Sequence, residues 1–518
     1  MKTTKKQRVT MLDRLERVGN KLPHPAVIFM ILSGVLILLS GLFYWMGTEV
    51  TYMGINMAND GQVEEMTVAA RNLLSRDGLA FILTSAVTNF TGFAPLGVVI
   101  AAMLGIGIAD GSGLLTTALK GAVAKTPKPL MTAMIVFFGI LSCLASDAGY
   151  VIVIPLAAIL FLSVGRHPIA GLAAGFAGVA GGFGASLLLS PIDSIMAGLT
   201  QEAAQIMNPL YEVDVTANWY FGIASVFLLT ILGAFITDKI VEPRLGKYEG
   251  ATVIDTEEEL SLRIITPEER RGLRFAGMTA LCLVVLILAL LLPYNGLLRG
   301  EPGTPITRSV FMSSLVVIIS LFFALLGLAY GVGAKTIKNN KEAVGLMEKA
   351  LGTMSGFIVL AFFSAQFLAY FNYTNLGTIV AVNGAELLIR WNLTGMPLIL
   401  MFMVVVMITN FLMGSMTAKW AILAPVFVPM LMEIGFSPEF VQAAYRIADS
   451  TTNIVSPMMA YFALVVVFFQ KYDKKAGIGT LVSTMLPFTI IFTIGWVILL
   501  FVFYLFNINI GPGVGAYL

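Results

Sequence analysis

Charged side chains are scarce in this sequence. Lys, Arg, Asp and Glu make up 12% of its 518 residues, whereas hydrophobic residues make up 58%. A soluble domain typically carries about 25% charged residues. The composition therefore excludes a soluble globular protein and predicts a polytopic membrane protein that contacts lipid.

Cysteine, histidine and nucleotide-binding motifs are also nearly or wholly missing. Cys143 and Cys282 lie in apolar runs, which excludes a disulfide framework, and His24 and His167 each precede a proline at a predicted helix start. Neither G-x-x-x-x-G-K-[ST] nor H-E-x-x-H occurs, so we expect no organic cofactor and an energy source in an ion gradient. The net charge of +2 gives no reason to expect a nucleic-acid partner.

Long apolar runs dominate the rest of the chain. A membrane span needs roughly 20 apolar residues. Nine runs meet this condition, at about 25–46, 78–109, 168–200, 219–238, 273–293, 308–333, 350–371, 437–469 and 478–507.

Two further apolar stretches, 129–164 and 396–432, are too long for one span. Each would extend about 54 Å as a straight helix at ~1.5 Å per residue, against a hydrocarbon core of ~30 Å. Each is interrupted by small and polar residues, "SCLASDAG" (142–149) and "TNFLMGSMTAK" (409–419). We interpret both as re-entrant hairpins that return to the side from which they enter.

The positive charges support this topology. With nine spans and two hairpins, 25 of the 32 Lys and Arg residues fall on the side of the N-terminus and five on the other side. The positive-inside rule then predicts a cytoplasmic N-terminus and an external C-terminus. The remaining two, Lys419 and Arg446, lie at membrane depth.

The predicted fold class is an all-α polytopic membrane protein with nine transmembrane helices and two re-entrant hairpins in an inverted repeat. A cytoplasmic tail (1–24) precedes a first half (25–238, with hairpin 129–164). A charged cytoplasmic linker (239–272) joins it to a second half (273–518, with hairpin 396–432).

The two hairpins resemble each other in sequence. "SDAGYVIVIP" (146–155) aligns without gaps on "MTAKWAILAP" (416–425), which pairs Asp147 with Thr417. A Ser-Pro pair follows each hairpin, at Pro191 in "LLLSPID" and at Pro457 in "NIVSPMM". Because the two units enter from opposite sides, they form an inverted repeat, an architecture that places broken helices and a substrate site near the bilayer midplane.

Each proline removes a helix hydrogen bond and frees a carbonyl group. Such a break is tolerated in a membrane only inside protein or beside a wet cavity. Oxygen ligands suited to a small cation surround both breaks, namely Ser190, Ser456, Thr451, Thr452 and Asn453. The alternative interpretation is a packing kink satisfied by neighbouring hydroxyl groups.

Charges at membrane depth need a reason, because each costs a few kcal/mol. Asp193 follows the first Ser-Pro pair, and Arg446 and Asp449 precede the second. Arg446 could hold a substrate carboxylate, with Asp193 or Asp449 as the ligand of a coupling cation or proton. Alternatively, Arg446 and Asp449, at i and i+3, neutralise each other as a structural ion pair.

Three further residues allow two interpretations each. Asp147 is either a ligand or a helix N-cap, and Lys419 either extends its ammonium group out of the membrane or meets an anion. Trp420 either stacks on a substrate ring or is a buried anchor. Pro438 in "FSPEF" is explained by local structure, with Ser437 as an N-cap.

Seven stretches of the chain resemble the AbgT family of p-aminobenzoyl-glutamate transporters. They run in order from residue 19 to the C-terminus: "GNKLPHP" (19–25), "NFTGFAPLG" (89–97), "GRHPIAGL" (165–172), "TDKIVEPRLG" (237–246), "AILAPVFVPM" (421–430), "RIADS" (446–450) and "IGPG" (510–513).

The resemblance implies a homodimer of nine-span protomers with two re-entrant hairpins in a bacterial inner membrane. It implies transport of p-aminobenzoyl-glutamate or, alternatively, efflux of sulfonamide antimetabolites. Residues implicated in the family correspond to Asp193, Thr417, Trp420, Pro438, Arg446, Asp449 and Pro457.

Together, the residues and the resemblance predict a site without catalytic groups. Arg446, Trp420, Thr417, Pro457, Asn453 and Pro438 are the predicted substrate-binding residues. Asp193, Asp449, Ser190 and Thr452 are the predicted ligands of a coupling ion, Na⁺ or H⁺, with the two carboxylates as its metal ligands. An intramembrane enzyme or a channel is the alternative from another class.

Two local departures from the family pattern fall at this site. The second hairpin reads "GSMTAKW", where we would expect a further serine and an apolar residue in place of Lys419. After "RIADS" the chain has "TTNIVSP", which is more polar than the pattern. Both departures bear on the substrate and the coupling ion.

Overall fold

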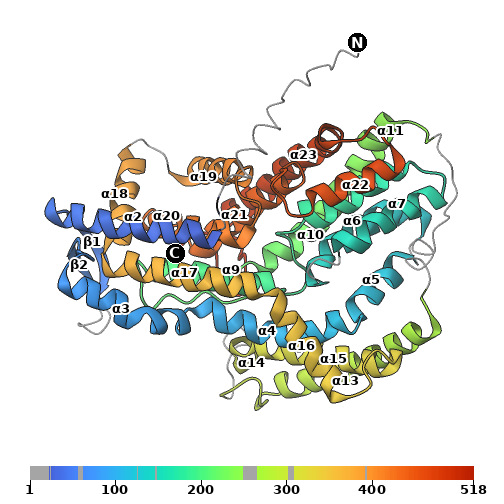
Figure 1. Cartoon of the computed structure of the whole chain (residues 1–518), viewed down its shortest axis with the longest axis horizontal. Coiled ribbons are helices and arrows are strands. Elements are labelled where there is room, and N and C mark those ends of the chain that lie inside the picture. The colour runs from blue at the N-terminus through green and yellow to red at the C-terminus, as the bar shows by residue number, and fades with distance from the viewer. Residues whose placement is uncertain are drawn as a thin grey trace, which may run out of the picture.

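The chain folds into long helices with one short β-hairpin (Figure 1). The structure is a computed structural model and describes Pro23 and residues 25–56, 62–124, 127–145, 149–248, 265–301, 309–390 and 394–518. The predicted tail (1–24), apart from Pro23, lies outside these residues, as do 249–264 of the predicted linker and Asp147.

The first half contains two strands and a series of helices. In chain order these are α2 (Pro25–Trp45), β1 (Glu49–Asn56), β2 (Gln62–Ala69), α3 (Arg76–Thr91), α4 (Ala94–Gly111), α5 (Leu114–Ala124), α6 (Met131–Leu141), α7 (Ile154–Ser163), α8 (Pro168–Phe176), α9 (Pro191–Ala204), α10 (Trp219–Ile236) and α11 (Glu242–Leu245). Short 3₁₀ or π-helical turns adjoin several of them, at Lys128–Leu130, Ser142–Ala145, Gly149–Val153, Ala177–Gly181 and Thr237–Val241.

In the described residues of the second half, the elements are helices, joined by loops. Its helices are α13 (Pro267–Leu291), α14 (Val310–Ser313), α15 (Leu315–Ala334), α16 (Asn340–Thr353), α17 (Ser355–Tyr373), α18 (Leu376–Arg390), α19 (Gly395–Asn410), α20 (Met416–Glu433), α21 (Pro438–Asn453), α22 (Phe462–Tyr472) and α23 (Ile478–Leu505).

Eight helical segments in the described residues are long and apolar enough to cross a membrane. Seven coincide with predicted spans, and the eighth is the second arm of the predicted hairpin 396–432. They are Pro25–Trp45, Arg76–Gly111, Trp219–Leu245, Pro267–Leu291, Leu315–Ala334, Ser355–Tyr373, Met416–Glu433 and Ile478–Leu505.

The two predicted spans missing from this set, 168–200 and 437–469, are broken in the middle. In the first, the chain leaves helical geometry after Gly181 and resumes it at Pro191, the first residue of α9. In the second, α21 ends at Asn453 and α22 begins at Phe462. Each break is wider than a proline kink. The helical piece on either side of a break is therefore shorter than the ~20 residues of a span.

Both predicted hairpins contain two α-helices, α6 and α7 in the first and α19 and α20 in the second. In the first, α6 has 11 residues and is about 16 Å long at ~1.5 Å per residue, which is too short to cross a ~30 Å core. Arg166, just after α7, donates a hydrogen bond to Thr132 at the start of α6 (2.7 Å), so the two ends of this hairpin meet. This contact supports the re-entrant interpretation.

The β-hairpin corrects the prediction of an all-α protein. Strands β1 and β2 pair antiparallel, with Glu49 opposite Ala69 and Asn56 opposite Gln62. Polar and apolar residues alternate over four residues in each strand, "EVTY" (49–52) and "EMTV" (65–68), which is a short form of the period-two pattern of a half-buried strand. The hairpin lies between the predicted spans 25–46 and 78–109, where the sequence analysis placed no element.

Segments that the charge pattern assigns to the external side lie together at one end of the helices. The phenol of Tyr211 donates a hydrogen bond to Glu439 (3.0 Å). The C-terminal tail joins the same face, since Ser437 donates to the carbonyl of Gly515 (2.7 Å). Burial, with a smaller effect of Glu439, raises the pKa of Tyr211 above its ordinary value, so this phenol stays protonated and donates.

Segments assigned to the cytoplasmic side also lie together. Arg166 binds both oxygens of Glu242 through Nε (3.1 and 3.0 Å) and contacts Asp238 (2.5 Å). Arg244 donates to the carbonyl of Ser483 (3.0 Å). The grouping of segments at the two ends agrees with the predicted topology, although which end faces the cytoplasm stays a prediction.

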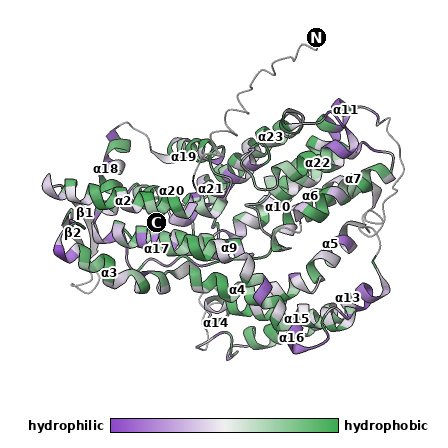
Figure 2. Ribbon diagram, viewed as in Figure 1, coloured by the Kyte–Doolittle hydropathy of each residue, from purple (hydrophilic) through white to green (hydrophobic). Residues whose placement is uncertain are grey.

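The helices consist mainly of hydrophobic residues (Figure 2), and many large hydrophobic side chains are exposed at the surface. Side chains of α13, such as Leu281 (67% exposed) and Val285 (57% exposed), point away from the protein. In water such a surface would be unfavourable, whereas in lipid it is the expected one. The main buried core lies among α6–α10 and α17–α23, and a smaller core lies between α4, α5, α13 and α15.

Cysteine labelling tests the topology. In a background with both native cysteines replaced by serine, we expect Glu212→Cys to react in intact cells with a membrane-impermeant maleimide. We expect Lys247→Cys to react only after permeabilisation, because both side chains are exposed but lie at opposite ends of the helices. The reverse pattern would invert the assignment.

Candidate functional site

The first break lies at the interface between the halves of the chain. The first break, Gly182–Ser190, lies against α21, and the backbone N–H of Gly184 donates to the hydroxyl of Ser450 (2.8 Å). A Cβ at position 184 would lie 2.6 Å from that oxygen and 2.9 Å from the carbonyl oxygen of Arg446. Only glycine permits this approach, which brings Arg446 to the first break.

Arg446 forms an ion pair with Asp193 across this interface. The distance from Nη2 to Asp193 Oδ1 is 2.6 Å, and both side chains are buried. The other oxygen of Asp193 accepts hydrogen bonds from the backbone N–H and the hydroxyl of Ser190 (both 2.7 Å). Because these bonds cap α9, its first turn fixes the carboxylate in front of the guanidinium.

The proposed pairing of Arg446 with Asp449 is wrong. The two residues share a helix, but each side chain turns to a partner on another helix: Arg446 to Asp193 on α9, and Asp449 to Lys419 on α20. An i, i+3 spacing permits a contact but is outweighed here by partners fixed in fully buried positions.

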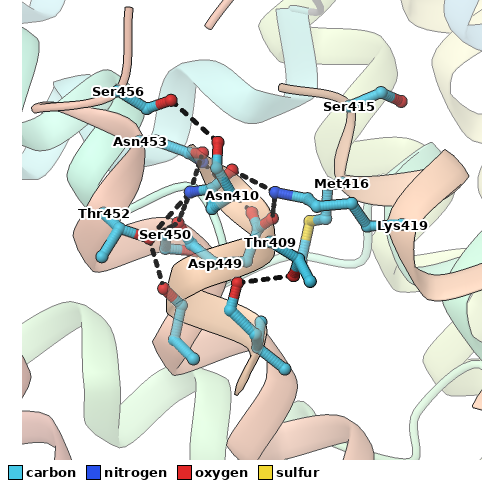
Figure 3. A network of polar contacts seen from close by, with 12 residues as sticks. Thr409, Asn410, Ser415, Met416, Lys419, Asp449, Ser450, Thr452, Asn453 and Ser456 are labelled. Atoms are coloured by element: carbon cyan, nitrogen blue, oxygen red, sulfur yellow. Dashed lines mark hydrogen bonds and ion pairs between the residues drawn. The ribbon is translucent and has the colours of Figure 1, made fainter. Parts of the chain in front are cut away.

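Lys419 is buried and does not extend its ammonium group out of the membrane. Its side chain is 2% exposed, and its Nζ lies 2.5 Å from Oδ1 of Asp449, which is 0% exposed. Nζ also donates to Oδ1 of Asn410, at the end of the first arm of hairpin 396–432. Of the two interpretations, the meeting with an anion is confirmed (Figure 3).

Asn410 is the centre of this cluster and was missed by the sequence analysis. Its Nδ2 donates to the carbonyl oxygen of Asp449 (2.9 Å), the hydroxyl of Thr452 (2.7 Å) and Oδ1 of Asn453 (2.9 Å). The backbone carbonyl oxygen of Asn410 accepts a hydrogen bond from the hydroxyl of Ser456 (2.8 Å). The available signal was an amide side chain inside the apolar run of the hairpin, where every polar group needs a partner.

Asn453 binds the second carboxylate oxygen of Asp449. Its Nδ2 donates to Oδ2 of that carboxylate (3.1 Å). Thr451 donates to the carbonyl oxygen of Ile447 (2.8 Å) within α21 and takes no part in the cluster.

Trp420 is completely buried and links three helices. Its Nε1 donates to the hydroxyl of Thr200 on α9 (2.9 Å), which also accepts from Gln442 on α21 (2.7 Å). Its ring lies 4.5 Å from that of Tyr445. The buried-anchor interpretation describes this conformation, and stacking on a substrate stays a prediction.

The remaining predicted residues lie at different distances from these clusters. Thr417 and Pro457 are partly exposed, at the tip of hairpin 396–432 and in the second break. Pro438 begins α21, where Ser437 caps the helix by accepting from the N–H of Phe440 (3.2 Å), and lies about 12 Å along the axis from Arg446 at ~1.5 Å per residue. Local structure explains Pro438 fully.

The structure does not unite Asp193 and Asp449 as ligands of one metal ion, since each carboxylate binds a different basic side chain. No group of three or more His, Cys, Asp or Glu side chains that could hold a metal ion occurs in the described part of the chain. The oxygen atoms of Ser190 and Thr452 lie beside Asp193 and Asn410, respectively.

Many apolar helices, two broken helices and a buried ion pair between the halves are typical of membrane transporters. The family model of the AbgT transporters matches residues 10–518. The chain therefore belongs to the AbgT family, a family of multi-pass membrane transporters, as its sequence motifs suggested.

Relatives of known sequence or structure agree with this assignment. The chain is 39% identical over 503 residues to the p-aminobenzoyl-glutamate transport protein of Escherichia coli (strain K12), with 96% of each chain covered. It resembles the structure of the Alcanivorax borkumensis YdaH transporter (41% identity, TM-score 0.87, 95% of this chain and 100% of that chain). It also resembles Neisseria gonorrhoeae MtrF, described with a class of antimetabolite efflux pumps (43% identity, TM-score 0.89, 98% and 100%).

Replacing Asp193 tests how strongly the ion pair joins the halves. Asp193→Asn leaves the Arg446 guanidinium buried without an anion, and we expect a loss of about 3–5 kcal/mol in unfolding free energy. Unfolding of the purified protein in detergent measures this, with Glu348→Gln on an exposed face of α16 as the control. Equal stability of the two variants would contradict a structural role for the pair.

Proposed function

We propose that this protein is a secondary transporter of p-aminobenzoyl-glutamate or a related aromatic carboxylate. It works in a bacterial inner membrane, as a homodimer with a cytoplasmic N-terminus and an external C-terminus, and is not an enzyme. The family and the Escherichia coli relative support the substrate class. The observation that carries the proposal is the position of Arg446.

Arg446 is a buried guanidinium group with donor capacity to spare. Its Nε has no hydrogen-bond partner among the described residues, and Nη1 makes only a long contact with the carbonyl oxygen of Gly184 (3.4 Å). A buried polar atom without a partner is unfavourable. A substrate carboxylate could take two guanidinium donors in parallel, the arrangement that arginine prefers.

Binding of a carboxylate to Arg446 would couple transport to an ion. The substrate would compete with Asp193 for the guanidinium, and Asp193 would then be a buried anion without its cation. Its charge would have to be neutralised by Na⁺ or H⁺, since an isolated carboxylate in the membrane is very unfavourable. Ser190, which already binds Asp193, would provide a further oxygen ligand.

The other predicted residues would line the path of the substrate. The ring of Trp420 on α20 packs against that of Tyr445 on α21, and Thr417 and Pro457 lie at partly exposed positions near the hairpin tip and the second break. Rocking of one half against the other would open this site to either side of the membrane in turn. Nine spans with two re-entrant hairpins form the framework of this motion.

Flux measurements in liposomes test the main proposal. We expect labelled p-aminobenzoyl-glutamate to move faster than in empty liposomes when a Na⁺ or a pH gradient is imposed, each separately. Arg446→Lys keeps the charge but loses the planar fork, so we expect at least a tenfold lower flux, about 1.4 kcal/mol or more of lost interaction. Glu348→Gln should transport as the wild type does. Flux no faster than in empty liposomes under either gradient would end the proposal.

The second candidate function is efflux of sulfonamide-type antimetabolites through the same site. The resemblance to MtrF favours it, because that protein is described with antimetabolite efflux pumps. In a sulfonamide-sensitive strain, we expect expression to lower drug accumulation and the Arg446→Lys variant to restore it. Unchanged accumulation on expression of the wild type would exclude this function.

A further inference from the structure

Asp449, the second carboxylate predicted to bind the coupling cation, already has a cation. The ammonium group of Lys419 contacts two side-chain oxygen atoms, Oδ1 of Asp449 and Oδ1 of Asn410. We propose that Lys419 is a built-in counter-ion that takes the place of Na⁺ at Asp449, so that this half of the site works without Na⁺. This inference rests on the proposed transport function and specifies its ion requirement.

The ligands around the ammonium group are those that a small cation would use. A carboxylate oxygen and an amide oxygen are hard oxygen ligands, of the kind that bind Na⁺ at broken membrane helices. Both are buried and come from different elements, Asn410 at the tip of the hairpin and Asp449 just before the second break. Without Lys419, the same two atoms would face each other with no positive charge between them.

The hydrogen bonds around Asn410 fix which atom faces the cation. Because its Nδ2 donates to three acceptors on α21, its Oδ1 is held towards Lys419. Oδ2 of Asp449 is meanwhile bound by Nδ2 of Asn453. The oxygen pair is therefore oriented by its surroundings rather than by the lysine alone (Figure 3).

The charges also exclude a second cation. Lys419 and Asp449 neutralise each other, so Na⁺ arriving at Asp449 would meet the ammonium group at short range in a medium of low dielectric constant. The neighbouring Tyr445 hydroxyl, 3.5 Å from Asp449 Oδ1, adds a dipole but no charge. Arg446 on α21 is paired with Asp193, so its charge is balanced away from this cluster.

The two ion pairs differ in what they join. Asp193 and Arg446 belong to different halves, so rocking of the halves can separate them. Lys419, Asn410 and Asp449 all belong to the second hairpin and the helix after it, and a movement between the halves leaves them together. Lys419 therefore stays beside Asp449 during this movement, and Asp193 is the carboxylate that can exchange ions.

Ion-specific stabilisation of the full-length protein in detergent tests the proposal without requiring transport. We compare unfolding midpoints in NaCl, KCl and N-methylglucamine chloride at equal ionic strength and pH. The wild type should have the same midpoint in all three. Lys419→Gln empties the cation position, and its midpoint should rise in NaCl over KCl by about 2 °C or more, with saturation.

Two variants control this comparison. Lys419→Arg keeps the charge and should show no preference for Na⁺, and Lys419→Gln combined with Asp449→Asn should lose the preference with the ligand. A monodisperse Lys419→Gln protein without a Na⁺-specific rise would overturn the proposal. So would a wild-type protein that Na⁺ stabilises specifically, if Asp449→Asn abolishes the effect.

Should Lys419→Gln fail to fold, flux by the wild type still decides. We expect any Na⁺ dependence of flux to disappear in Asp193→Asn. Na⁺ dependence that survives in Asp193→Asn but is lost in Asp449→Asn would overturn the inference. Absence of any flux would refute the transport proposal alone, because the stabilisation measurements on the wild type would still test the place of Lys419.

Discussion

The arrangement of this protein depends on the high free energy of a charge inside a membrane. A charged side chain at the bilayer centre costs a few kcal/mol or more, and an unpaired one is rarely tolerated. Four charges lie buried near the two breaks, and they form two pairs, Arg446 with Asp193 and Lys419 with Asp449. Three helices, α9, α20 and α21, must therefore stay in register, because a shift of any one would leave a buried charge without its partner.

The same requirement explains how the chain tolerates two gaps in its helices. Unwound backbone in a membrane is stable only where other protein groups bind it. Ser450 accepts from the N–H of Gly184, and Ser456 donates to the carbonyl oxygen of Asn410. Ser190 and Asp193 cap the helix that restarts after the first gap. The hydroxyl and amide residues that look out of place in an apolar sequence are the partners that these gaps need.

Much of this could be predicted from the sequence because it depends on local composition. Apolar runs placed seven spans, and Ser-Pro pairs placed both breaks, since segment length and proline geometry act within a few residues. The pairing of the charges could not be predicted this way. Arg446 and Asp193 are 253 residues apart, and their contact depends on the packing of α9 against α21. Spacing alone favoured Asp449 as the partner, and the β-hairpin was hidden by the dominance of apolar runs around it.

The two departures from the family pattern turn out to be one feature. Lys419 lies in the second hairpin and "TTN" at the end of α21, yet Asn410 and Asp449 connect Lys419 with Thr452 and Asn453 in a single cluster. The acceptors of Lys419 are Asn410 and Asp449, and Thr452 and Asn453 bind these acceptors rather than the lysine itself. The two departures are therefore coupled through the groups that they share. Their joint occurrence is therefore expected of a site whose charge is balanced from within the chain, next to a second site where Asp193 and Arg446 can exchange partners.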